Sequence, residues 1–161
     1  MMAPLADLAD TWSSIYSGSA VIKSAVGFAH VGALLAGGGM AIAADRATLA
    51  AHKFGGDAMR READRLGGVH GIVLASIAII LISGFLLMFA DLDAYLQSRA
   101  FWNKMALVAA LLVNGGVLRH TGRVAASGDA RAHRALATAA RVSVGLWFVT
   151  TLVGAVLPNA L

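Results

Sequence analysis

The stretch that decides the fold is VHGIVLASIAIILISGFLLMFA, residues 69–90, in which no residue is charged. A membrane-spanning helix needs about 20 consecutive, mostly apolar residues. A charged side chain at the bilayer centre costs at least about 2.5–3.5 kcal/mol on insertion scales. This stretch is therefore predicted to be a transmembrane helix.

Three further apolar stretches flank it. Residues 24–44 precede it, and residues 101–118 and 142–157 follow it, the last being stopped by Pro158. The composition agrees, because only 14% of the residues are charged, whereas soluble domains carry about a quarter. We predict an all-α polytopic membrane protein, an up-down bundle of four transmembrane helices that forms a single domain over residues 1–161.

The charges gather between these stretches. Ten of the 13 Lys and Arg residues lie in 45–68 and 119–141, whereas the segment 91–100 carries only Arg99. The positive-inside rule places the two basic stretches in the cytoplasm. We therefore expect the bacterial inner (plasma) membrane, with both chain ends periplasmic. Since the basic residues adjoin apolar stretches, we expect contact with anionic lipid headgroups of the bilayer and no nucleic-acid binding.

Helix is also expected outside the spans. The segment LADLADTWSSIYS, residues 5–17, places Leu5, Leu8, Trp12 and Ile15 at helical spacing. It predicts a short N-terminal interfacial helix on the outer surface of the membrane. The two basic stretches are expected to prolong the spans as helix.

Small residues recur along the first span. Ala29, Ala33 and Gly37 stand at every fourth position, as do Ala25 and Ala41. Helices in lipid associate through close packing, which small residues allow. This face of the first span is expected to lie against another helix.

The chain has no cysteine, which excludes disulfides, thiolate ligands and Fe–S clusters. A metal or cofactor must then be held by His, Met, carboxylate or backbone groups. Nothing resembles a nucleophilic triad, a phosphate loop or paired catalytic carboxylates. The sequence leaves open whether the protein is an enzyme.

His30 is the strongest candidate ligand, because it lies inside the first span, clear of both ends. An ionisable group within a span is by default a functional-site hypothesis, and imidazole is a common metal and haem ligand. Met88 is expected at a similar depth, so the pair could hold copper or serve as axial haem ligands. The simpler alternative is a neutral histidine that is hydrogen-bonded across helices.

Polar groups in the third and fourth spans have simpler interpretations. Lys104 is expected to reach the interface along its flexible stem. Asn103 and Asn114 share a helix face and are expected to bond neighbouring helices. Thr150 and Thr151 are expected to bond their own backbone carbonyls.

A second group of histidines is expected at the cytoplasmic side. His70 begins the second span and His120 ends the third, so the two come to a similar depth. They could hold a bis-histidine haem, with nearby arginines for the propionates. The alternative is a pair of interfacial histidines in water and headgroups.

Two segments carry a resemblance to a known family. AHVGALLAGGGMAIAADR, residues 29–46, resembles the first-span pattern of the CopD-like membrane superfamily, and FWNKMALVAALLVNG, residues 101–115, resembles the third span of the same group. That superfamily includes CopD copper-resistance domains and HemJ-type protoporphyrinogen oxidases. The resemblance implies a haem b ligand at His30 and a functional lysine at Lys104; from CopD it implies copper handling.

Three functions remain open. The first is a small membrane redox protein that binds haem b through His30, with Lys104 and Asn103 close to the cofactor, for electron transfer or for porphyrin- or quinone-linked oxidation. The second is copper binding by His30 and Met88. The third is a structural subunit of a larger respiratory or photosynthetic complex, or of a homo-oligomer, which needs no chemistry of its own.

Overall fold

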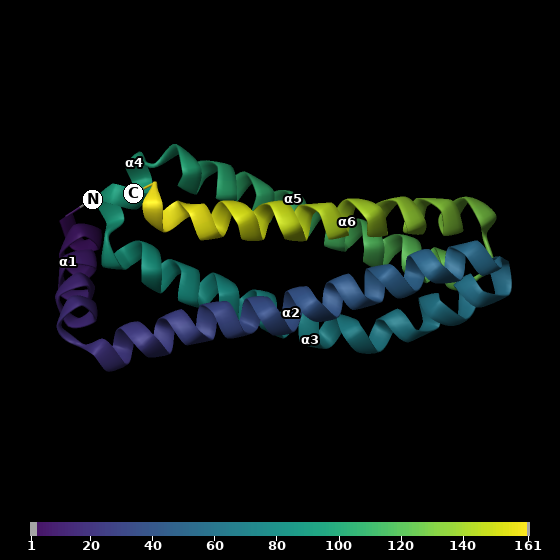
Figure 1. Cartoon of the computed structure of the whole chain (residues 1–161), viewed down its shortest axis with the longest axis horizontal. Helices are drawn as coiled ribbons and strands as arrows, with labels where there is room; N and C mark the ends of the chain where they lie inside the picture. The colour runs from purple at the N-terminus through teal and green to yellow at the C-terminus, as the bar shows by residue number, and fades with distance from the viewer. Residues whose placement is uncertain (1–2, 161) are drawn as a thin grey trace.

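Helices account for almost the whole chain in the computed structural model (Figure 1). The structure describes the backbone of residues 3–160 and the side chains of residues 7–59, 61–62, 64–65, 68–69 and 71–160. The helices, in chain order, are α1 (Ala3–Gly18), α2 (Ala20–Phe54), α3 (Gly56–Ala90), α4 (Leu92–Gln97), α5 (Arg99–Ala126), α6 (Ala130–Val156) and the 3₁₀ turn η1 (Leu157–Asn159). The described part contains no strand, which confirms the all-α prediction.

Within the described residues, four helices are long and apolar enough to cross a membrane: α2, α5, residues 71–90 of α3, and the segment 130–159 that contains α6. Three of them contain a predicted span in full, and residues 71–90 match the predicted span 69–90 except for its first two residues. The helices are longer than those spans, because the basic stretches 45–68 and 119–141 are helical almost throughout. The expectation that these stretches prolong the spans is therefore confirmed.

Two tight turns fold the four long helices into two hairpins. Gly55 joins α2 to α3 at φ 98°, and Gly128, between α5 and α6, has φ 90°. This left-handed region is open to glycine at little cost. Asp129 then caps α6, since its carboxylate accepts hydrogen bonds from the N–H groups of Arg131 (2.6 Å) and Ala132 (3.3 Å). These bonds lower the pKa of the Asp129 carboxyl below its ordinary value.

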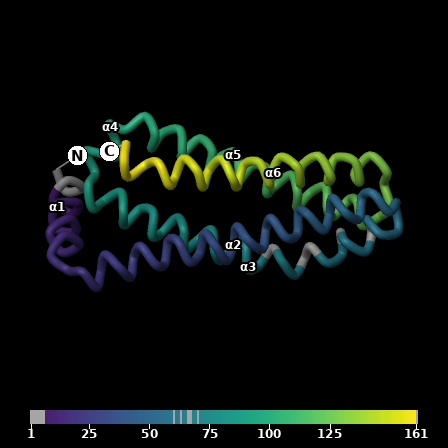
Figure 2. The backbone as a smooth tube through the Cα atoms, in the orientation of Figure 1, coloured from purple at the N-terminus to yellow at the C-terminus, as the bar shows by residue number. Residues whose placement is uncertain are grey.

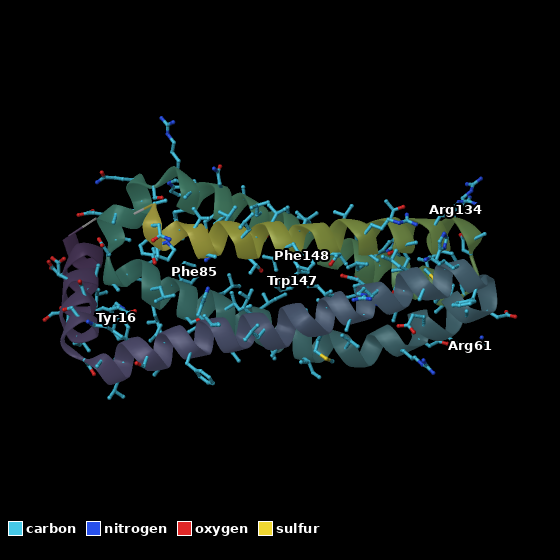
Figure 3. All side chains as sticks on the ribbon, in the orientation of Figure 1. Tyr16, Arg61, Phe85, Arg134, Trp147 and Phe148 are labelled. Atoms are coloured by element: carbon cyan, nitrogen blue, oxygen red, sulfur yellow. The ribbon has the colours of Figure 1, made fainter. Side chains whose placement is uncertain are left out.

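The best-packed core lies near the two turns rather than at mid-molecule. Leu136, Ala137 and Ala125 are fully buried there, together with Met59 of α3. Figure 2 shows the two hairpins converging toward this end and lying further apart toward the chain ends. Arg61 and Arg134 lie at the same end in Figure 3. An apolar core beneath charged surfaces is what helices need where they stand in water.

The opposite end is closed by α1, which crosses the end of the bundle (Figure 1). The indole N–H of Trp12 donates to the carbonyl of Leu86 at 2.7 Å, and the Ser13 hydroxyl donates to the carbonyl of Ala90 at 2.8 Å. These bonds tie α1 to the last turn of α3. The predicted N-terminal helix is confirmed, with bounds slightly wider than predicted.

The small residues of α2 make close helix contacts. A Cβ on Gly37 would lie 2.4 Å from Cβ of Ser76 in α3, and one on Gly38 would lie 3.1 Å from the ring of Trp147 in α6. Ala33 is also buried. The prediction that this face of the first span packs against another helix is confirmed at its centre.

Candidate cofactor-binding cavity

A cavity of about 630 Å³ runs between the two hairpins. All four long helices line it, and most of the lining side chains are aliphatic. Its volume is within the range of about 300–1,000 Å³ that is typical of small-molecule sites. Among the described residues, its ionisable side chains are His30, Asp45, Tyr95, Lys104 and Arg119.

His30 of α2 reaches across to α3. Its Nδ1 lies 2.9 Å from the Ser83 hydroxyl oxygen, and that hydroxyl lies 2.6 Å from the carbonyl oxygen of Ile79. Because the hydroxyl donates its single proton to the carbonyl, it accepts the Nδ1–H of His30. We therefore assign the proton to Nδ1, which leaves Nε2 with a free lone pair in a side chain that lines the cavity.

The imidazole lies beside Gly84 of α3. A Cβ on Gly84 would lie 3.4 Å from Cε1 of His30, which is van der Waals contact. The ring therefore lies close to the backbone of α3. The ring orientation is fixed from this side by Gly84 and by the bond to Ser83.

Lys104 of α5 enters the cavity from the opposite hairpin. A Cβ on Gly154 of α6 would lie 3.5 Å from both Cε and Nζ of Lys104. The lysine lines the cavity and is close enough to His30 for an electrostatic interaction. Its ammonium thus lies at the cavity wall beside Gly154, two residues before the end of α6. That it reaches the interface stays a prediction.

Thr150 of α6 adds a hydroxyl with an unused hydrogen-bonding capacity. Its side chain is 6% exposed, and Oγ1 has no hydrogen-bond partner within the part of the chain that the structure describes. Thr121 and Thr138, by contrast, donate to carbonyls of their own helices. The prediction for Thr150 is therefore wrong. A buried hydroxyl without a partner is costly, and a polar ligand in the cavity would supply one.

The phenol of Tyr95 lines the cavity close to the chain ends. Burial, and then the neighbouring Tyr16 and Asp91, raise the pKa of Tyr95 above its ordinary value of 10.0. The phenol therefore stays protonated at neutral pH. It is a neutral donor at this end of the cavity.

The other predicted site residues lie elsewhere. Asn103 and His120 of α5 are exposed and do not line the cavity. Met88 of α3 is partly buried and is not among the lining residues either. The side chain of His70 lies outside the described residues. Asn114 donates to the carbonyl of Ala139 at 3.1 Å, which confirms its predicted bond to another helix.

The described residues contain no group of three or more His, Asp or Glu side chains that could hold a metal ion. Neither a family model, nor a curated protein, nor a solved structure matches the chain. The resemblance to the CopD-like superfamily stays a prediction.

The sequence predicted no role in the site for Ser83, Thr150, Gly84 or Gly154. The signal for Ser83 was weak but present, since it is one of very few polar residues in the span 69–90. Gly154 and Thr150 share the α6 face of Trp147, at spacings of three to four residues. Which residues of the other helices lie against His30 depends on the register between the helices.

Proposed function

We propose that this chain is an integral membrane protein of four up-and-down spans that binds haem b in the cavity, with Nε2 of His30 as an axial ligand. The His30–Ser83 hydrogen bond carries this proposal. Metal-ligating histidines almost always donate the other ring N–H to a fixed partner, which sets the tautomer and the ring orientation. His30 has this arrangement through its Nδ1 and the Ser83 hydroxyl.

The membrane placement is supported by what the helices expose. Phe28 is 80% exposed, Val113 70% and Phe148 64%, all within the apolar spans. Soluble monomers rarely expose apolar surface of this extent. The basic helical extensions, at one end only, support a cytoplasmic location for the two turns and a periplasmic one for both chain ends. The proposed location is the bacterial inner membrane.

The residues present fit haem b in three respects. The cavity walls are aliphatic, as the porphyrin face requires. The ammonium of Lys104 would pair with a propionate, and the hydroxyl of Thr150 would gain the partner that it lacks. When bound, haem would supply one-electron redox chemistry. The protein's part is to bind and orient the ring and to exclude water.

Copper is less well supported as the bound group. The copper hypothesis pairs His30 with Met88, but Met88 does not line the cavity. A single imidazole is a weak copper site without further ligands. The distribution of polar side chains therefore favours haem over copper.

The test is the absorption spectrum of the detergent-purified protein after expression with a haem precursor. We expect a Soret band, lost in His30→Ala and retained in the control His52→Ala, which changes a histidine of the basic extension. A wild-type protein that is helical by circular dichroism, yet colourless after incubation with haem, would refute the proposal. If His120→Ala abolishes the band and His30→Ala does not, the haem belongs to the His70–His120 pair instead.

A further inference from the structure

The cavity is long. His30 and Asp45 both line it and stand fifteen residues apart on α2, which at 1.5 Å per residue is about 22 Å. The lining continues beyond His30 to Tyr95 and Pro158, close to the chain ends. The part between Trp147 and Asp45 lies toward the turns, away from His30.

The part toward the turns opens sideways, between α3 and α5. Leu74 of α3 is 53% exposed and Leu112 of α5 is 44% exposed, although both line the cavity. Gly115 and Gly116 also line it, and a Cβ on either would meet open space. With the helices in a bilayer, this side faces the hydrocarbon interior and not water.

Trp147 marks the middle of the cavity. Its ring is 6% exposed and packs against Gly38 of α2. Figure 3 shows it between α6 and α2. Its neighbour Phe148 is 64% exposed and points to the outside of the bundle. A tryptophan at position 147 therefore reports on the cavity, and one at position 148 reports on the surrounding medium.

We infer that the half of the cavity between Trp147 and Asp45 holds the hydrocarbon chain of a membrane-dissolved molecule, admitted from the bilayer between α3 and α5. The aliphatic walls and the exposed cavity residues of α3 and α5 carry this inference. An isoprenoid quinone and a phospholipid both carry such a chain, and the test separates them. The inference rests on the proposed membrane placement and is independent of haem.

The experiment uses the fluorescence of Trp147 in the full chain carrying Trp12→Phe and Trp102→Phe. The protein is reconstituted in phosphatidylcholine vesicles that contain either phospholipid brominated on its acyl chains or a short-chain isoprenoid benzoquinone. The reference variant also carries Trp147→Phe and Phe148→Trp. Each signal is compared with that of the same variant in quencher-free vesicles.

We expect one of the two quenchers to act on Trp147 saturably, with half-quenching at a several-fold lower membrane fraction than for the tryptophan at 148. Saturation by the benzoquinone identifies a quinone chain, and saturation by the brominated lipid an acyl chain. Gly115→Leu should remove the saturable part. The matched control Gly145→Leu should keep it, because Gly145 is exposed, has free space for a Cβ and lies outside the cavity.

Three results would overturn the inference. The first is a tryptophan at 148 that is quenched while Trp147 shows no saturable quenching by either probe. The second is an equal response of Gly115→Leu and Gly145→Leu. The third is a tryptophan at 148 that brominated lipid does not quench, because the membrane placement then fails and the inference fails with it.

Discussion

In the proposed haem site, the Ser83 hydroxyl acts through His30, so its loss should weaken haem binding without abolishing it. Ser83→Ala removes the acceptor of the Nδ1–H at 2.9 Å and frees the imidazole to rotate. Loss of such a supporting bond lowers metal affinity by about 10- to 100-fold. Haem titration followed at the Soret band should therefore show a Kd increased by that factor.

The control is Ser76→Ala, two turns earlier on the same face of α3. Ser76 is buried, like Ser83, but contacts Gly37 instead of the imidazole. Its loss should leave the haem affinity unchanged. Equal weakening by both substitutions would mean that Ser83 acts only through packing.

At the scale of single residues, the sequence predicted the ligand candidate better than its surroundings. His30 could be singled out because one imidazole in an apolar span is unusual. Its partner Ser83 is 53 residues away, and the contact requires the register of α2 against α3. Thr150 was misjudged because a helical threonine usually bonds its own helix, and only the fold shows that this one does not.

At the scale of the helices, Gly37 sets how closely α2 approaches α3. Gly37→Ala would place a Cβ 2.4 Å from Cβ of Ser76, so the two helices must move apart. Overpacking of this kind costs typically about 1–3 kcal/mol. We expect a lower apparent Tm, measured by circular dichroism in detergent.

Gly39→Ala is the matched control, because its Cβ would meet nothing within 4 Å. Alanine is favoured over glycine in a helix interior by about 1 kcal/mol, so this variant should be as stable as the wild type or more so. A Gly37→Ala variant with the Tm of Gly39→Ala would show that the α2–α3 contact is loose.

The helices themselves were largely predictable, because their apolar lengths and the charges between them are direct consequences of lipid as a solvent. The turns at Gly55 and Gly128 were less predictable from the sequence. Each is a single glycine in a sequence that contains 18, and only the backbone shows which of them take positive φ. The sequence therefore predicted continuous helix through the basic stretches but not where it reverses.

At the scale of the molecule, the two ends differ in how they are held together. The end with the turns has a buried core of Met59, Leu136 and neighbouring alanines. From this core the cavity extends between the hairpins toward the other end, which is closed by α1 through Trp12 and Ser13. Rigid packing at one end can hold the hairpins while the other end leaves room for a ligand.

This arrangement can serve the proposed function only if the bilayer surrounds the cavity. Cysteine labelling tests that placement. The chain has no cysteine, so a single introduced thiol reports one position. Ser127 at the α5–α6 turn and Gln97 at the end of α4 are both exposed. In intact bacterial cells, a membrane-impermeant maleimide should label Gln97→Cys at once. It should label Ser127→Cys only after the inner membrane is permeabilised, because the proposed orientation places the basic end in the cytoplasm. The reversed pattern would invert the orientation, and labelling of both in intact cells would show that the helices do not cross the membrane.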